Sequence, residues 1–414
     1  MAGFFDAAEV TRRPLASTSP RCGACGLYLG CRSPKMPVTG DGRLGVLIVA
    51  EAPGAEEDRR NEQLIGDAGQ ELRRVCRSID IDLDRDCWKT NSLICRPPDN
   101  RKPTNNEIDY CRPNLTNAIR ELQPKVIIPL GGTAIRSVLG PHWRDDVGDV
   151  TTWVGWKIPL HKPNVWVAPN YHPSYVLREE KDKSSIAPVL KLWFSRHLEA
   201  AFALTDRPWV KVPDYASQIR IELDPAEAAK WIRSIIDRGG VTSFDYETNM
   251  LKPDSDEADI VSCAICWRGR ETVAYPMIGD AIHATKQYLL SPLPKIGANE
   301  KFEDRWSRAK LGCAVVNGVW DCMQSAHHLD CRQGITSVKF QGFVRLGQEP
   351  WDVSIKPYLT AEGGNTKNRI RQADLRTLLL YNGLDSLVEY HTGGIQRAEM
   401  LQQDTEAIRL GTVR

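Results

Sequence analysis

Four of the twelve cysteines occupy positions from which their thiolates can converge on one metal centre. Cys22 and Cys25 form a CxxC pair in a glycine-bearing loop, Cys95 follows a strand-like stretch, and Cys111 lies in a stretch with helical periodicity. Such a set suits a tetrahedral zinc ion and an iron–sulfur cluster about equally, and the spacing does not choose between them. Cys31, in the same loop, is a rival ligand.

The other cysteines are expected to pack in the protein interior. Cys263 and Cys266 also form a CxxC pair, but they lie in the strand-like run SCAICW, where residues three apart point to opposite faces. We therefore predict that this pair packs in a core. Ordinary burial is also expected of Cys76, Cys87, Cys313, Cys322 and Cys331.

A second set of reactive residues is acidic and lies in the other half of the chain. Asp245 and Glu247 are two apart on an apolar strand, so both carboxylates point to one face. Tyr381 and Asp385 are four apart on a predicted helix, one above the other. Another acid pair, at residues 303–304, begins a helix. Carboxylates from three elements would hold two hard divalent cations, which activate water and stabilise the leaving oxygen of a phosphodiester.

Two different sets of elements must position these residues. In the first half, strands and helices alternate, which predicts an α/β/α sandwich with a parallel sheet; the segments are 45–50, 69–79, 88–94, 106–122, 126–130 and 165–169. In the second half, a helix at 225–238 precedes a strand at 241–246 and a hairpin across 260–275, and helical periodicity dominates from residue 304. This pattern predicts an α/β domain with a mixed sheet.

Length, charge and hydropathy set the wider limits. A chain of 414 residues exceeds what one hydrophobic core usually serves, so we expect domains at 1–205 and 219–414, joined by a linker at 206–218. The 54 basic and 53 acidic residues nearly cancel, so any affinity for nucleic acid must come from local patches. The sequence shows neither a signal peptide nor a run of 18 apolar residues, and we expect a cytoplasmic protein without a membrane partner.

The order of motifs in the first half resembles that of the family 4 uracil-DNA glycosylases. The resemblance spans about residues 20–200 and rests on VAEAPGAEED at 49–58, IGDAG at 65–69, TNSLICRPPDNRKP at 90–103, Cys111, LGGTA at 130–134 and HPS at 172–174. It implies a glycosylase fold and a 4Fe-4S cluster whose ligands are Cys22, Cys25, Cys95 and Cys111.

The same resemblance implies roles in uracil excision. A glycosylase flips the nucleotide out, reads its base edge and stabilises the charge that develops on the departing uracil. Asn91 would read the uracil edge, and His172 would donate to uracil O2. Among the acids of the loop, Glu51, Glu57 and Asp58, Glu51 is favoured for positioning water and stabilising the cationic sugar. Further contacts with uracil or DNA are expected from Gly54, Leu64, Arg101 and Ser174.

Two residues depart from the family pattern. Ala50 replaces the usual glycine before Glu-Ala-Pro-Gly, and Leu64 replaces a phenylalanine on which the flipped uracil stacks. Stacking is worth about 1 to 3 kcal/mol per base, so these changes predict weakened excision. They also keep open an alternative, in which the first domain is a non-catalytic module that tethers the chain to DNA.

Basic residues near the predicted uracil pocket are candidates for holding DNA phosphates. They are Arg96, Arg101, Lys102, Arg112 and Arg120. For Arg112 and Arg120, a solvated helix face is an equal explanation.

The acidic set resembles that of the DnaQ-like exonucleases of the DEDD group, in particular the proofreading module of family A DNA polymerases. This resemblance spans about residues 220–395 and implies an RNase H-like domain that binds two Mg²⁺ or Mn²⁺ ions. The ligands would be Asp245, Glu247 and Asp385, while Tyr381 would orient the attacking water.

The middle acidic motif departs from the family. After Asn299 and Phe302, Glu303 occupies the usual aspartate position, and Asp304 is its substitute. Asp321 is expected to cap a helix.

Together the two resemblances predict an enzyme of a bacterium or a phage that excises uracil from DNA and degrades DNA from its 3′ end. We expect any DNA polymerase that works with it to be a separate protein.

Overall fold

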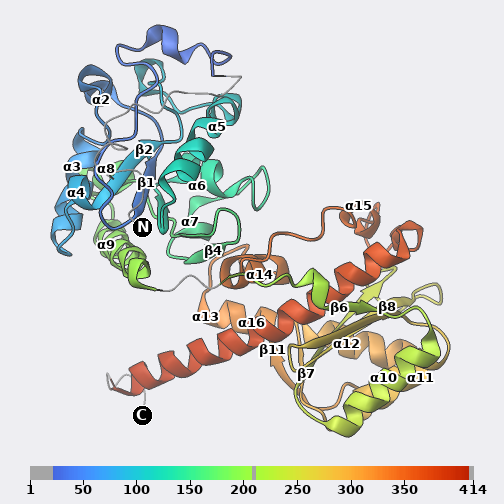
Figure 1. Ribbon diagram of the computed structural model, residues 1–414. Coiled ribbons are helices and arrows are strands. Elements are labelled where there is room, and N and C mark those ends of the chain that lie inside the picture. The colour runs from blue at the N-terminus through green and yellow to red at the C-terminus, as the bar shows by residue number, and fades with distance from the viewer. Residues whose placement is uncertain (1–21, 208–210, 410–414) are drawn as a thin grey trace, which may run out of the picture. The chain divides into compact units, whose positions relative to one another are not determined.

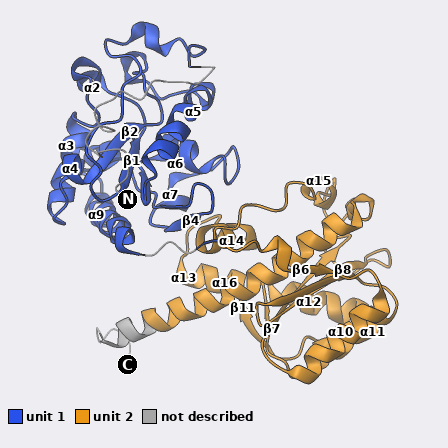
Figure 2. Ribbon diagram, viewed as in Figure 1, with its two compact units in different colours: residues 1–212 blue, residues 213–414 orange. Residues whose placement is uncertain are grey.

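The computed structural model describes residues 22–207 and 211–409. The chain divides into two compact units, residues 1–212 and 213–414 (Figure 2). Within the described residues, none of the helices combines the length and the apolar character needed to cross a membrane. All twelve cysteines are free thiols. Cys76, Cys87, Cys313 and Cys322 are buried as expected, but the prediction for Cys331 is wrong, because its side chain is exposed.

The first unit is built on a five-stranded sheet with the order β2-β1-β3-β5-β4. The central strand β1 is fully buried, as its sequence VLIVA requires. Four strands are parallel, as predicted, but β4 pairs with β5 in the antiparallel direction. The strands are β1 (Val46–Ala50), β2 (Cys87–Asn91), β3 (Val126–Pro129), β4 (Ile158–Leu160) and β5 (Val165–Val167).

Helices cover both faces of this sheet (Figure 1). On one face lie α3 (Asp67–Arg77), α4 (Leu83–Asp86), α8 (Pro173–Lys181) and α9 (Ala187–Phe202), and on the other lie α5 (Asn105–Leu122), α6 (Gly132–Leu139) and α7 (Val150–Trp153). The short α2 (Ala55–Arg60) follows β1, and 3₁₀ turns occupy η1 (Leu27–Gly30), η2 (Pro98–Asn100) and η3 (Ala203–Asp206). The predicted sandwich is therefore present.

Parallel strands bring their carboxyl ends to one edge of the sheet, and this edge collects the predicted uracil-binding residues. Glu51 follows β1, Asn91 is the last residue of β2, Gly131 lies just beyond β3, and His172 lies beyond β5. His172 is also the N-cap of α8, so its position is fixed by the start of that helix.

The second unit contains a six-stranded mixed sheet with the order β11-β10-β7-β8-β9-β6. The predicted hairpin is β8–β9, which extends the antiparallel pairing from β7, whereas β10, β11 and β6 add parallel edges. The strands are β6 (Ile219–Ile221), β7 (Thr242–Thr248), β8 (Ile260–Trp267), β9 (Glu271–Pro276), β10 (Lys295–Gly297) and β11 (Gly318–Asp321).

Helices α10 (Pro225–Arg238) and α11 (Asp280–Leu290) pack together on one face, over a core that includes Phe244, Tyr246 and Trp306. The long α16 (Leu375–Arg409) crosses the other face and contacts β6 to β10 (Figure 1). The remaining helices are α12 (Glu300–Trp306), α13 (Cys322–Leu329), α14 (Val338–Leu346) and α15 (Lys356–Leu359), with short turns η4 (Ala216–Gln218), η5 (Ser307–Leu311) and η6 (Ile370–Gln372). Because α16 lies over β7, it brings Tyr381 and Asp385 to the strand that carries Asp245 and Glu247.

Candidate active sites

The four cysteines predicted to share a centre line one narrow pocket. Cys22 and Cys25 come from the loop before η1, Cys95 from the loop after β2, and Cys111 from α5. Their rival, Cys31, donates its thiol to the backbone oxygens of Leu27 and Arg96, at 3.2 and 3.5 Å. The structure therefore brings together the same four cysteines that the motif order selected.

The spacing of these thiols can be compared with that of zinc ligands. A Zn–S bond of about 2.3 Å places tetrahedral ligands about 3.8 Å apart. No three of the four sulfur atoms, all of which the structure describes, lie within 4.8 Å of one another. Four cysteine sulfurs around one pocket are also the donor set of the iron–sulfur cluster that the resemblance implies.

Backbone N–H groups already point at two of the sulfur atoms. The amides of Lys35 and Ile94 donate to Cys95 and Cys111, at 3.3 and 3.4 Å. Burial raises the pKa of the Cys95 thiol to about 12 and that of Cys111 to about 11. A bound cationic centre would reverse this preference and hold the thiolates, while the N–H groups stabilise their charge.

Asn91 is buried at the carboxyl edge of the sheet and is held by a residue that the sequence did not single out. Its amide nitrogen donates to Gln63 Oε1, and Gln63 Nε2 in turn donates to the Pro37 carbonyl oxygen at 3.0 Å. The Asn91 side-chain oxygen has no hydrogen-bond partner among the described residues. This buried acceptor suits the N3–H group of uracil.

His172 is held in one tautomer by Ser174. The Ser174 backbone N–H donates to His172 Nδ1 at 3.2 Å, and the Ser174 hydroxyl lies 2.7 Å from the same nitrogen. Burial lowers the pKa of His172, although the charge of Glu51 opposes this shift. The neutral ring therefore carries its proton on Nε2, where it is available as a hydrogen-bond donor.

The three acids of the loop have different partners. Glu57 accepts the backbone N–H groups of Gly54, Ile65 and Gly66, and thereby closes the loop before α3. Asp58 accepts the N–H groups of Arg32 and Ser33. Both are consequently structural carboxylates.

Glu51 remains the acid with a position suited to chemistry. It accepts a hydrogen bond of 2.6 Å from Thr133 Oγ1 and lies close enough to His172 for its charge to affect that ring. At Gly131, between β3 and α6, a Cβ would lie 3.0 Å from that of His172. The glycine thus allows the two loops to approach each other.

Leu64 has an unusual backbone conformation. Its φ of +55° lies in the left-handed region, which is uncommon for a residue with a branched side chain. Arg73 donates to its carbonyl oxygen, and a Cβ at Gly69 would lie 1.7 Å from that oxygen. The side chain is 5% exposed and packs in the core of the unit. The structure places leucine beside Gln63 with little area exposed for stacking.

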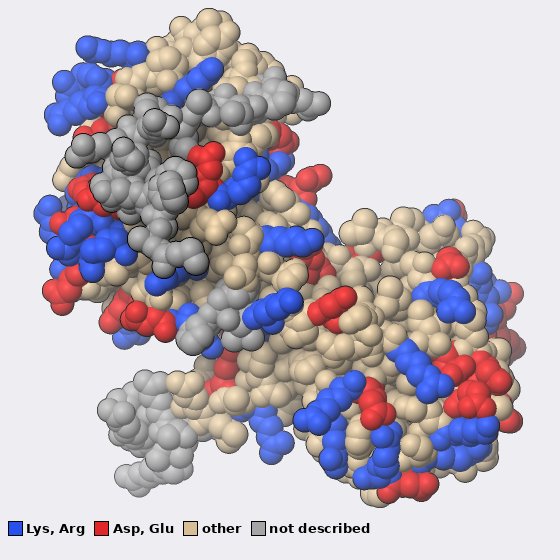
Figure 3. Space-filling view, in the orientation of Figure 1, with Lys and Arg blue, Asp and Glu red and all other residues tan. Residues whose placement is uncertain are grey.

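The predicted phosphate-binding residues do not act as one group. Arg101 is paired with Glu107 at 2.6 Å, Arg96 donates to Asn100, and Arg112 pairs with Asp109 at 2.7 Å. The prediction for Arg120 is wrong, because it lies near the carboxyl end of α5, at the opposite edge of the sheet from Asn91. In the view of Figure 3, acidic and basic side chains are interspersed over both units.

In the second unit, ligand atoms of Asp245, Glu247 and Asp385 lie within 4.8 Å of one another. Asp245 and Glu247 point to one face of β7, opposite Ala264 and Ser262 of β8, as their spacing predicted. Oxygen ligands at this separation fit a hard divalent cation such as Mg²⁺ or Mn²⁺.

Two further side chains organise this acidic site. Lys339 of α14 donates to both carboxylate oxygens of Asp385, at 2.6 and 2.7 Å, and to the Tyr381 hydroxyl at 2.7 Å. Asn382 donates to Asp245 at 2.7 Å. Neither residue was predicted from the sequence, because each lies far along the chain from its partner. Lys339 is 42 and 46 residues from Tyr381 and Asp385, and Asn382 is 137 residues from Asp245.

Glu303 and Asp304 point in different directions. Glu303 is 3% exposed, and its charge interacts with that of Asp245. Asp304 instead pairs with Arg308 at 2.7 Å and accepts the Val315 backbone N–H at 2.9 Å. Burial and charge thus associate Glu303 with the acidic site, although it is not one of the three acids whose ligand atoms lie within 4.8 Å of one another, and Asp304 has a structural role. Asp321 caps α13 by accepting two backbone N–H groups, as predicted.

A fifth carboxyl group, Glu389, lies one turn beyond Asp385 on α16. It is 1% exposed, and neither its Oε2 nor that of Glu303 has a hydrogen-bond partner among the described residues. Burial and mutual repulsion raise the pKa values of Asp245, Glu247, Asp385, Glu303 and Glu389. Burial acts to lower the pKa of Lys339, but the hydrogen bond to Asp385 and the charges of Asp385, Glu247 and Asp245 together outweigh burial and raise that pKa.

Comparison with known proteins identifies the first unit. Residues 37–194 match the model of the uracil DNA glycosylase superfamily. A type-4 uracil-DNA glycosylase of Pyrobaculum aerophilum is 32% identical over 180 residues, which make up 43% of this chain and 90% of that relative. The chain belongs to the uracil-DNA glycosylase superfamily. We therefore call residues 1–212 the glycosylase unit.

The glycosylase unit is only part of what the chain shares with other proteins. A DNA polymerase of Bacillus phage SP01 is 26% identical over 333 residues, covering 72% of this chain and 34% of the polymerase. Since 72% of 414 residues is about 298, this likeness extends beyond either unit alone. The catalytic core of RRP6 from Trypanosoma brucei has a TM-score of 0.35 and 14% identity; the match covers 45% of this chain and about half, 48%, of that one. A likeness at that level decides nothing about function.

The cysteine arrangement predicts a brown protein that contains iron and absorbs light at about 400 nm. Cys95→Ser and Cys111→Ser should each lose the colour and destabilise the glycosylase unit, because each removes a ligand that joins a loop to α5. Cys31→Ser is the matched control and should keep both the iron and the colour. Elemental analysis that finds zinc and no iron would contradict this assignment.

The acidic site predicts that Mn²⁺ raises the melting temperature of the second unit more at pH 8 than at pH 5.5. The raised pKa values mean that the folded unit binds more protons than the unfolded chain. The stability of the unit without cations therefore falls as pH rises from about 4, the ordinary pKa of Asp and Glu, through the raised pKa values of the folded unit. A bound cation relieves the repulsion between the carboxylates.

Two variants separate this effect from general charge changes. Asp245→Asn should remove most of the Mn²⁺ shift. Asp304→Asn should retain the shift, because Arg308 holds Asp304 away from the site and lowers its pKa despite partial burial. Equal Mn²⁺ shifts at both pH values, or an undiminished shift in Asp245→Asn, would argue against cation binding by this cluster.

Proposed function

We propose that this chain excises uracil from DNA with its first unit and hydrolyses DNA from the 3′ end with its second. The observation that carries the first activity is that two polar groups available for hydrogen bonding lie at the carboxyl edge of the same sheet. These are the buried Asn91 oxygen without a partner and the His172 ring held with its proton on Nε2. Together they offer one acceptor and one donor to the polar edges of a flipped base.

In the proposed excision, each group has a defined task. Asn91 accepts the uracil N3–H, and its amide nitrogen, released from Gln63, donates to O4. His172 donates from Nε2 to O2, where negative charge grows as the glycosidic bond breaks, while Ser174 keeps the ring in that tautomer. Glu51 stabilises the positive charge on the sugar and orients the water that attacks it.

The remaining residues support binding of the DNA. Gly54 leaves room for the Glu57 carboxylate, since a Cβ there would lie 2.7 Å from it. Leu64 covers one side of the uracil pocket. Arg101, held at the surface by Glu107, presents its remaining donors to a phosphate. Cys22, Cys25, Cys95 and Cys111 hold a 4Fe-4S cluster that joins the N-terminal loop to α5.

In the proposed nuclease, the chain supplies the ligands and aligns the water. Asp245, Glu247, Asp385 and Glu303 hold two Mg²⁺ or Mn²⁺ ions. When bound, these ions lower the pKa of water and neutralise charge on the leaving oxygen. Tyr381 orients the attacking water through its hydroxyl. Lys339 fixes Asp385 and Tyr381 relative to each other, since it donates to both.

A specific observation favours an alternative for the first unit. Leu64 is almost fully buried with a left-handed backbone, so it offers little of the flat surface that a phenylalanine would provide. A unit with weak excision would still bind DNA and would tether the nuclease to its substrate.

The likeness to a phage DNA polymerase supports a role near DNA synthesis. We propose that the chain works beside a DNA polymerase in the cytoplasm of a bacterial or phage-infected cell. Uracil-containing DNA and DNA 3′ ends are the proposed substrates.

Uracil release by the full chain should survive excess EDTA, because the excision residues need no divalent cation. Asn91→Ala should abolish release, seen as alkali-labile breakage of a uracil oligonucleotide, and should leave Mg²⁺-dependent digestion of a plain oligonucleotide intact. Asp245→Ala should show the reverse pattern, with digestion reduced at least about a thousandfold, or about 4 kcal/mol of transition-state stabilisation. Absence of any uracil release by the parent protein would favour the tether.

The middle acid of the nuclease is tested by a matched pair of isosteric changes. Glu303→Gln should reduce digestion by a factor comparable to that of Asp245→Ala, because it removes a charged ligand. Asp304→Asn should change digestion little, since Asp304 pairs with Arg308. A 5′-labelled strand should shorten into a ladder from its 3′ end, whereas immediate release of the 5′-terminal nucleotide would reverse the proposed direction.

A further inference from the structure

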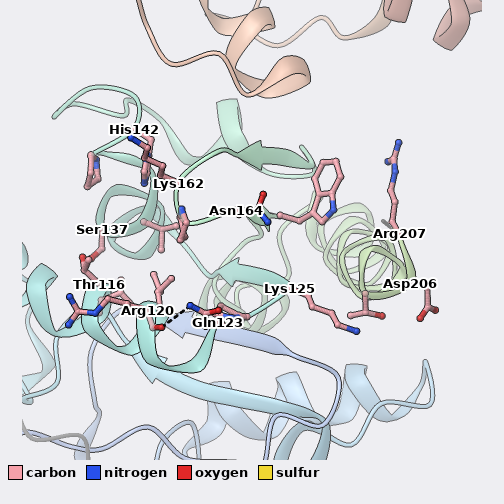
Figure 4. A pocket seen from close by; sticks show the side chains of 18 residues that line it. Thr116, Arg120, Gln123, Lys125, Ser137, His142, Lys162, Asn164, Asp206 and Arg207 are labelled. Atoms are coloured by element: carbon pink, nitrogen blue, oxygen red, sulfur yellow. Dashed lines mark hydrogen bonds between the residues drawn. The ribbon is translucent and has the colours of Figure 1, made fainter. Parts of the chain in front are cut away.

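A large pocket in the glycosylase unit lies away from the proposed uracil site. It has a volume of about 1010 Å³ and opens between the carboxyl ends of α5 and α6, the turn before β5 and the residues after α9 (Figure 4). Its residue Lys125 precedes β3, and Asn164 precedes β5, so the pocket borders the amino edge of the sheet. Asn91 and His172 lie at the carboxyl edge, about 16 Å away for a strand of five residues.

Cations surround this pocket. Figure 4 shows Arg120, Lys125, Lys162 and Arg207 spaced around it, with a single acid, Asp206, among its lining residues. Within the described part of the chain, Lys125, Lys162 and Arg207 form no ion pair with an acid. Arg120 donates to the side-chain oxygen of the neutral Asn117 at 2.8 Å. The pocket therefore carries a net positive charge that an anionic ligand would complement.

The walls between the cations are apolar and aromatic. Leu115, Ile119 and Val138 line one part, and the Trp166 ring lines another, with the Arg207 guanidinium 5.3 Å from its centroid. Trp166 itself is only 7% exposed, so the flat, charged surface open to a ligand is the guanidinium of the exposed Arg207, which lies over the indole. Such a surface suits a ligand with a planar ring and a nearby negative group.

Neutral polar groups complete the lining. Ser137 is 2% exposed, and its hydroxyl has no hydrogen-bond partner among the described residues, although it borders the pocket. The side-chain amides of Gln123 and Asn164 offer both donors and acceptors. A buried hydroxyl without a partner is costly unless a ligand or water satisfies it.

We propose that this pocket is a second nucleotide-binding site, distinct from the uracil pocket. A nucleotide combines the features that the lining complements: phosphate for the cations, a planar base for the Trp166–Arg207 surface, and base-edge groups for the amides. The volume exceeds the needs of a single nucleotide. The ligand is a free nucleotide or one unit of a single strand, and the two sources share this chemistry.

The test measures binding to the full chain by calorimetry in EDTA, which withholds the divalent cations from the acidic site. The two probes are thymidine 5′-monophosphate and a thymidylate tetramer. Lys125→Glu combined with Lys162→Glu should weaken the binding of at least one probe by about tenfold or more. The control is Lys181→Glu with Lys183→Glu, which changes the net charge equally at exposed positions outside the pocket.

The outcomes distinguish the two ligand sources and also test the proposal itself. Selective loss of monophosphate binding identifies a free nucleotide, and selective loss of tetramer binding identifies a strand. Equal affinities in the pocket variant and the control, or no saturable binding of either probe by the parent, overturn the proposal. Uracil excision by the same preparations should be unchanged by the pocket variant, so a failure of the proposed glycosylase activity would be seen separately.

Discussion

Repulsion between buried carboxyl groups is the constraint on which the second unit depends. Asp245, Glu247, Asp385, Glu303 and Glu389 are brought together by β7, α12 and α16, and burial makes their charged forms unfavourable. Lys339 offsets part of this repulsion by binding Asp385, but one ammonium group cannot neutralise five carboxylates. The site is therefore arranged in advance for cations, and the surrounding fold must keep the acids in place without them.

The glycosylase unit meets a related constraint with neutral groups. Burial raises the pKa values of the Cys95 and Cys111 thiols, and the residues proposed to read the base are a neutral amide, Asn91, and a histidine whose pKa burial lowers, His172. Their orientation comes from hydrogen bonds to Gln63 and Ser174. Accurate placement of neutral donors and acceptors costs less desolvation energy than burial of charges, and it suits recognition of an uncharged base.

Sequence reasoning located most of this architecture because the strong signals are local. The apolar run of β1 and the amphipathic α10 were recognisable from residue type and spacing, and α10 begins and ends where predicted. The short strands β4, β6, β10 and β11 were missed because three or four residues give no measurable period.

In the candidate sites too, the residues with a local sequence signal were predicted and those defined by long-range contacts were not. Asp245 and Glu247 were found from their spacing along one strand, whereas Lys339 and Gln63 gain their roles only from contacts across 28 to 46 residues. The choice between Glu303 and Asp304 also required the structure. Neighbouring residues on a helix point about 100° apart, and sequence alone does not say which direction faces the site.

Each candidate site is made entirely from residues of one unit. The cysteine pocket and the proposed uracil site draw on residues 22–174, and the acidic site on residues 245–389. Each site can therefore be inherited as a whole: a recombination event between the units would transmit either set of residues intact. Selection can likewise remove one of the two proposed activities through a single substitution and leave the residues of the other unit unchanged.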